Sequence, residues 1–159
     1  MSADLAKCIT EALSAVLVPC GFTKGPLFLR ASADVFHLVQ LQGSDTNTHA
    51  SSRYTINLGV WVPALSAGEK PSLAAAHWRQ RLGFLCPEQE DVWWQISAQR
   101  NAPAVAREIA ERIERCALPR LASLSNSRAL LALWRSGTSP GLTKVQASRF
   151  SNVLVGAAG

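Results

Sequence analysis

The sequence lacks the short patterns that most directly reveal a catalytic or metal centre. Among three histidines and four cysteines there is no His pair four residues apart and no Cys-x-x-Cys, the spacings that zinc sites use. The nucleophile motif Gly-x-Ser-x-Gly is missing, and neither Gly-x-x-x-x-Gly-Lys-Ser/Thr nor Gly-x-Gly-x-x-Gly occurs to hold a phosphate. We therefore expect no metal and no cofactor, and an enzyme would have to assemble its site from scattered residues.

Long apolar runs are absent as well. No stretch approaches the roughly 20 apolar residues that a membrane span requires, and the N-terminus lacks the basic start and unbroken apolar block of a secretory signal. We therefore expect a cytoplasmic protein without a membrane partner. In that compartment the cysteines are expected to be reduced, buried thiols, although their even number would permit two disulfides in an oxidising one. They are Cys8, Cys20, Cys86 and Cys116.

The spacing of apolar residues predicts the element order α-β-β-β-α-β-α-α. Apolar side chains recur every three or four positions over residues 5–17, as in a helix, and strands are expected over residues 27–31, 35–42 and 54–62. A short helix after Ser72 is expected to reach about residue 82, and a fourth strand covers residues 92–97. Helices are then expected from Asn101 to a break or kink at Pro119, over 127–135 and over 142–155.

These elements predict an α+β fold. Short or polar connections favour an antiparallel meander of about four strands, packed against N-terminal and C-terminal helices on one face. With 159 residues, 48% of them hydrophobic, the chain has enough apolar content for one domain. We assign residues 1–136 to that domain and residues 137–159 to a basic helical extension, whose docking the sequence leaves open. The shared apolar face of the longest strand is formed by Tyr54, Ile56, Leu58, Val60 and Val62.

Catalytic candidates are few, and each has a simpler structural interpretation. His37 lies in an apolar strand, which favours a core or edge histidine, and His49 lies in a polar loop, which favours a solvated one. Acids cluster over residues 88–91, where a solvated turn is a simpler interpretation than an acid–base pair. An enzyme hypothesis would have to rely on one segment of the chain. Its candidates are His77, Arg79, Arg81 and Asp91.

Tryptophan is more informative, since five Trp accompany a single Tyr. Adjacent Trp93 and Trp94 in a strand must point to opposite faces, so one can face the core while the other needs a cover or a partner. Tryptophan is enriched at binding hot spots, although packing of both rings in the core is the alternative. The binding candidates are Trp61, Trp93, Trp94, Asp91, Arg79 and Arg81.

The excess positive charge of +5 is confined to the second part of the chain. Residues 1–97 carry seven basic and eight acidic side chains, whereas residues 98–159 carry nine basic and three acidic ones. A basic helical tail could follow nucleic-acid phosphates or an acidic protein surface, and a solvated basic face is the alternative to both. The tail candidates are Arg120, Arg128, Arg135, Lys144 and Arg149.

Several short segments, taken in order, are similar to one family. They are LVPCGF at residues 17–22, the strand with Phe28 and Arg30, FHLVQLQ at 36–42, YTINLGV at 54–60, RLG at 81–83 and DVWW at 91–94. Over about residues 5–133 the chain resembles a small bacterial domain-of-unknown-function family, number four-three-zero-four. The resemblance implies an α+β build and supplies no activity, cofactor or catalytic residue. It does not cover the basic tail after Ser136.

Three functions are therefore considered. By analogy with accessory or immunity-type bacterial proteins, the first is a non-catalytic module that binds a protein, with an acidic partner as one option. The second is nucleic-acid binding through the basic C-terminal helices, and the third is an unrecognised enzyme. The sequence leaves the partner and the oligomeric state open.

Overall fold

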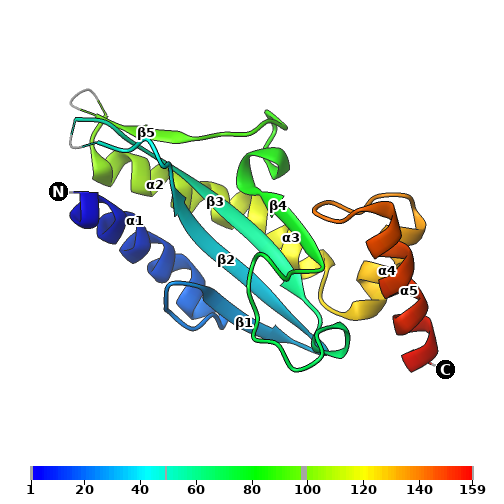
Figure 1. Ribbon diagram of the computed structural model, residues 1–159. Helices are drawn as coiled ribbons and strands as arrows, with labels where there is room; N and C mark the ends of the chain where they lie inside the picture. The colour runs from blue at the N-terminus through cyan, green and yellow to red at the C-terminus, as the bar shows by residue number, and fades with distance from the viewer. Residues whose placement is uncertain (1, 49, 98–99, 159) are drawn as a thin grey trace.

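The computed structural model describes residues 2–48, 50–97 and 100–158, so the expectation for His49 lies outside the described residues. The chain forms an antiparallel sheet with helices on one face (Figure 1). The helices α1 (Ser2–Leu17) and α2 (Ala102–Arg112) pack side by side behind that sheet. The strands are β1 (Phe28–Ser32), β2 (Val35–Gly43), β3 (Ser52–Trp61), β4 (Trp78–Arg81) and β5 (Trp94–Ile96).

Strand β3 is the centre of the sheet. Strands β1, β2, β3 and β4 follow one another in space, and β5 pairs with the start of β3. Because β2 occupies one edge of β3, β4 and β5 lie end to end along the other edge, at residues 57–60 and 52–54 of β3. Just before β5, the Val92 carbonyl accepts a hydrogen bond of 2.9 Å from the Thr55 hydroxyl of β3. The chain from residue 82 to 93 thus leaves this edge and returns to it.

The face of the sheet that meets the helices, called here the inner face, holds the main core. The expected alternating set on β3 and just beyond it, Tyr54 to Val62, is buried there, as are Val35, His37 and Val39 of β2. Ile9 and Leu13 of α1 and the apolar stripe of α2 pack against them. Burying each large apolar side chain contributes roughly 1.5–3 kcal/mol. The predicted α+β class and antiparallel meander are confirmed.

The helical segment that begins with α2 changes its winding before Pro119. α2 passes into a π-helix (η4, Ile113–Ala117) and then into α3 (Leu118–Ser123). Proline has no backbone N–H, so Pro119 cannot donate to the carbonyl four residues earlier, and a wider turn accommodates this. The expected disruption at Pro119 is therefore a local π-turn within a continuous helical path.

The last two helices lie beyond the end of the sheet (Figure 1). In α4 (Ser127–Arg135) the N-cap Asn126 accepts from the Ala129 N–H at 2.9 Å, and α5 (Lys144–Ala158) packs on α4. The Phe150 ring contacts the rings of His77 and Trp134 at centroid distances of 4.8 and 6.2 Å. Leu154 is buried with the main core, so the basic extension packs on the rest of the chain. Among the described helices, none has the length and apolarity needed to cross a membrane.

Two local predictions are wrong. Residues 72–82 do not form a helix: the Ser72 hydroxyl caps a single turn through the Ala75 N–H at 3.1 Å, and residues 78–81 become β4. Pairing with β3 buries Trp78 completely, which outweighs the helical tendency of this segment. His77 therefore precedes a strand. Cys20 is exposed rather than buried, because it ends the 3-10 turn that follows α1.

Candidate binding surface on the outer sheet face

The sheet face away from α1 and α2, called here the outer face, has two parts. The segment between β3 and β4 crosses one end of it (Figure 1) and closes a small second core around Leu38, Trp61 and Ala76. The Phe36 and Trp61 rings lie 5.8 Å apart there. Trp61, a predicted binding residue, is only 6% exposed and serves this small core.

Gly59 allows the crossing segment to approach the sheet. A Cβ at this position would lie 3.0 Å from the Leu73 Cδ1 atom and 3.2 Å from the Ala76 Cβ atom. Such contacts are tighter than a relaxed side chain tolerates, so a larger residue here would push the segment outward. The close packing of the crossing segment on this end of the outer face therefore requires glycine at position 59.

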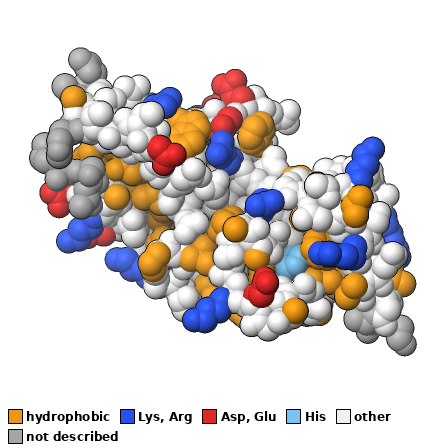
Figure 2. All heavy atoms as spheres, viewed as in Figure 1, with side chains coloured by type: hydrophobic (Ala, Val, Ile, Leu, Met, Phe, Trp, Pro, Cys, Tyr) orange, Lys and Arg blue, Asp and Glu red, His pale blue; other side chains and the backbone are white. Residues whose placement is uncertain are grey.

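The other part of the outer face carries polar and charged side chains. Strand alternation places Arg79 opposite Gly59 and Arg81 opposite Asn57, so both arginines point outward while Trp78 points to the core. Arg53, opposite Gln95 of β5, points the same way. In the space-filling view, basic side chains are spread over this side of the molecule and stand beside exposed hydrophobic groups (Figure 2).

Trp93 lies between two of these arginines. Its ring centroid is 5.3 Å from the guanidinium carbon of Arg81 and 6.0 Å from that of Arg53. One Asp91 oxygen accepts from Arg81 Nη1 at 2.6 Å and from the Trp93 indole N–H at 3.3 Å. About a third of each partner of the Arg81–Asp91 pair is exposed, 36% and 37%, so the ion pair adds at most about 1 kcal/mol of stability. We call Arg53, Arg81, Asp91 and Trp93 the outer cluster.

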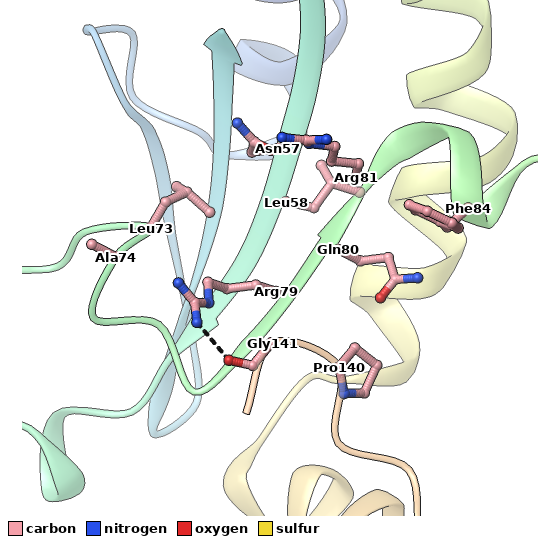
Figure 3. A pocket seen from close by; sticks show the side chains of 10 residues that line it. All are labelled: Asn57, Leu58, Leu73, Ala74, Arg79, Gln80, Arg81, Phe84, Pro140 and Gly141. Carbon is pink, nitrogen blue, oxygen red and sulfur yellow. Dashed lines mark hydrogen bonds between the residues drawn. The ribbon is translucent and has the colours of Figure 1, made fainter. Parts of the chain in front are cut away.

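A cavity of 570 Å³ runs along β4 beside this cluster. Figure 3 shows Arg79 and Gln80 extending in different directions from β4, with Phe84 and the Pro140–Gly141 turn at its borders. Leu73 and Ala74, from the crossing segment, line it as well. The cavity thus combines apolar walls with guanidinium groups, the mixture that small-molecule and side-chain pockets use.

The C-terminal extension holds Arg79 in place. Arg79 Nη2 donates to the Gly141 carbonyl at 2.5 Å, and the Arg79 backbone N–H donates to the Pro140 carbonyl at 3.0 Å. Gly141 has φ +83°, and a Cβ on it would lie 2.7 Å from the Arg79 Cβ atom, so this contact requires glycine. Arg79 Nε is buried and has no hydrogen-bond partner among the described residues. Part of the hydrogen-bonding capacity of Arg79 therefore remains unused.

The outer cluster is positively charged. It holds two arginines and one carboxylate, which pairs with Arg81, and Arg79 adds a third guanidinium nearby. Glu88, from the same loop as Asp91, points elsewhere and binds Arg112 through two hydrogen bonds of 2.7 and 2.8 Å. Hydrogen bonding to Arg112 lowers the pKa of Glu88 to about 2. Glu90 is exposed in that loop.

The two described histidines, His37 and His77, do not join this cluster. His77 Nδ1 accepts from the Val62 N–H at 3.0 Å, and the ring lines a different hollow against Phe150. Burial lowers the pKa of His77 to about 4. His37 Nδ1 accepts from Arg30 Nη2 at 2.8 Å, its Nε2 lies 2.9 Å from the Leu124 carbonyl, and burial lowers the pKa of His37. The candidates on which an enzyme hypothesis would rely are thus only partly brought together: Arg79, Arg81 and Asp91 share the outer face without His77.

Trp94 and the tail candidates lie elsewhere. Trp94 is 1% exposed on the inner face, opposite in direction to Trp93 as predicted. Arg120 lies over the buried Trp78 ring and Arg149 over Phe150. The others line separate hollows, Arg128 in one and Arg135 with Lys144 in another. In the part of the chain that the structure describes, no three metal-binding side chains come together.

Sequence reasoning missed Arg53, Phe84 and Gly141 as parts of this surface. Strand alternation could have found Arg53, but the predicted strand began one residue after it. The Gly141 contact joins residues 62 positions apart, and no local pattern carries it.

A family model described as Domain of unknown function (DUF4304) matches residues 13–123. Comparison with curated proteins and with solved structures finds no match. The matched range contains all five strands and the whole outer cluster, but α4, α5 and the Pro140–Gly141 turn lie outside it.

Proposed function

Because the chain belongs to the DUF4304 family, whose description gives no activity, we propose a function from the surface itself. The chain is a non-catalytic binding module, of the accessory or immunity type, that recognises an acidic segment of a partner protein. The observation that carries this proposal is the outer cluster, in which Arg53 and Arg81 flank the Trp93 ring on a face that none of the described helices covers.

The chemistry of the cluster suits a carboxylate. Guanidinium groups present paired donors that match carboxylate oxygens, and arginine and tryptophan are the residues most enriched at interface hot spots. Asp91 already occupies one such position, accepting from Arg81 and from the Trp93 indole. A partner carboxylate would meet the same donors, together with Arg53, whose hydrogen bond to the Thr46 hydroxyl is 3.5 Å long.

A protein partner is favoured over nucleic acid by the distribution of charge and apolar surface. A phosphate backbone requires a continuous track of basic residues, whereas the basic side chains of the tail line several separate hollows. The outer cavity instead has apolar borders at Leu73 and Phe84 next to Arg79 and Arg81. That combination fits an acidic segment that also carries an apolar side chain.

The test compares two charge-matched variants. We expect a short glutamate-rich peptide containing one phenylalanine to bind the full chain, and its glutamine counterpart to bind much more weakly. Arg81→Gln should reduce the affinity about tenfold, the effect of a hot-spot contact. Arg128→Gln removes the same charge from α4 and should change the affinity less than about twofold.

A single-stranded oligonucleotide serves as the competing probe. Tight oligonucleotide binding that falls steeply with salt, and that Arg128→Gln weakens as much as Arg81→Gln, would assign the chain to nucleic-acid binding. Equal loss of peptide binding in both variants would also overturn the proposal, because the peptide would then be responding to net charge alone.

A further inference from the structure

A second cavity, of 590 Å³, lies between α2 and the loop that follows the 3-10 turn Leu82–Leu85 (η3), and it shares no lining residue with the cavity along β4. Cys86, directly after η3, and Cys116, in the π-helix η4, both line it. Cys86 is 2% exposed and Cys116 is half-buried at the cavity. Two thiols separated by 30 positions in the chain are thus placed at one site.

The two thiols are neighbours at this cavity. The Cys86 S–H donates to the Leu82 carbonyl, with 3.4 Å between Sγ and the oxygen, and the nearby Cys86 thiol helps to raise the pKa of Cys116. Arg112 is fixed by two hydrogen bonds to Glu88 and lies 3.6 Å from a Glu108 oxygen. The hydrogen bonds of Cys86 and Arg112 therefore fix two of the side chains that line the cavity.

The π-turn contributes to this arrangement. Because η4 is wound more widely than an α-helix, the residues within it face a different direction from a regular continuation of α2. Cys116 is one of the five residues of η4, and η3 packs against that turn. Short π-segments occur frequently at functional sites, and here one of them brings a thiol to a cavity.

We propose that Cys86 and Cys116 form a redox-active thiol pair, which a peroxide oxidises to a disulfide across this cavity. Both S–H bonds break and one S–S bond forms. The two electrons reduce the O–O bond of the peroxide, and the two thiol protons leave with its oxygens as two water molecules when the peroxide is hydrogen peroxide. The disulfide would tie the loop that carries Asp91 to the π-helix η4, independently of whether the outer face binds an acidic partner.

The surroundings of the pair set its reactivity. The charged groups that line the cavity are Glu88, Glu108, Glu111, Arg112 and Arg115. Burial and the hydrogen bond with Cys86 raise the pKa of Cys116 to about 11. Since thiolates are the species that peroxides oxidise, we expect slow oxidation at neutral pH and faster oxidation at higher pH. The pair would thus respond to sustained exposure to the oxidant.

The experiment treats the folded full chain with hydrogen peroxide and maps its disulfides by mass spectrometry. We expect a Cys86–Cys116 cross-link that a phosphine reverses and that raises the melting temperature by about 5 °C or more. The control Cys20→Ser removes the exposed thiol and should leave the cross-link intact. Cys116→Ser should abolish it.

Phenylarsine oxide, which captures two neighbouring thiols, gives a second readout without any substitution. We expect one equivalent to bind the reduced wild-type chain and to protect Cys86 and Cys116 from alkylation. Peroxide that modifies Cys8 or Cys20 but yields no Cys86–Cys116 cross-link would overturn the proposal. A cross-link that forms only in denaturant would do the same.

Discussion

The two faces of the sheet are built from the same strands but by different means. On the inner face, alternate residues of β2 and β3 pack against α1 and α2. The alternation of apolar residues within each strand therefore determines which side chains are buried. On the outer face, the outer cluster combines side chains of β3, β4 and the segment before β5, and the neighbouring Arg79 depends on a turn near residue 141. Local alternation therefore determines the inner face, whereas the outer cluster depends on how separate segments come together.

The adjacent tryptophans give the largest test of this contrast. Trp94 is 1% exposed in the core, so Trp94→Ala should lower the free energy of unfolding by about 3–5 kcal/mol. Trp93 is half-buried on the outer side, and Trp93→Ala should lower it by about 1 kcal/mol or less. Urea unfolding of both variants measures the difference. Equal losses would remove the distinction between the two faces.

The next largest effect is the pH dependence of stability that arises from His77, which anchors the segment that crosses the outer face. Its folded pKa of about 4 lies below the value near 6.5 of an unfolded chain, so the unfolded state binds the proton more readily. The stability contributed by neutral His77 is therefore present above about pH 6.5 and is lost as the pH falls towards 4.

His77→Asn removes this titration. His37 is present in both the wild type and the variant, so its contribution cancels in the comparison. Between about pH 7.5 and pH 4.5, wild type should lose about 2–3 kcal/mol more unfolding free energy than the variant. Unfolding in urea at both pH values tests this. A wild-type chain that follows the variant across the range would mean that His77 titrates normally.

A smaller effect is expected at Gly59. Gly59→Ala adds a Cβ 3.0 Å from Leu73 and should destabilise the chain by about 1–3 kcal/mol, because the crossing segment must move. Gly156→Ala is the control, since nothing lies within 4 Å of its Cβ position in α5, and it should leave stability unchanged or slightly raised. Thermal unfolding of the two variants compares them, and a neutral Gly59→Ala would show that the segment does not press on the sheet.

The smallest stability effect is expected within the outer cluster itself. Arg81→Gln breaks an ion pair whose partners are each about one-third exposed, so the free energy of unfolding should fall by about 1 kcal/mol or less. Urea unfolding checks this in the same preparation that is used for binding. A loss of several kcal/mol would assign Arg81 a structural role and would make its binding data uninformative.

Strand alternation predicted the inner face well, and the reason is visible in β3. Its apolar residues alternate from Tyr54 to Val62, and a one-residue shift of register would turn every one of them outward. The structure of residues 72–81 was harder to predict, because a serine N-cap followed by alanines is also typical of a helix. Pairing of Trp78 with Val60 of β3, 18 positions earlier in the chain, decided between the two structures.

The candidate site was predicted in part. Arg79, Arg81, Asp91 and Trp93 were all named from the sequence, because arginine, acid and tryptophan concentrate in one segment. Their convergence required the path from β4 to β5, and the contribution of Arg53 required the pairing of β5 with β3. The grouping of Trp61 and Trp94 with them did not follow, since both rings are buried at different places.

The five tryptophan indole N–H signals offer the most direct measurement of the central claim, that the outer face is the binding surface. In a nitrogen–proton correlation spectrum of the full chain, titration with the glutamate-rich peptide should shift the Trp93 indole signal. The signals of the buried Trp61, Trp78, Trp94 and Trp134 should stay in place. A titration in which the Trp93 signal stays fixed while backbone signals of α4 and α5 move would contradict the account.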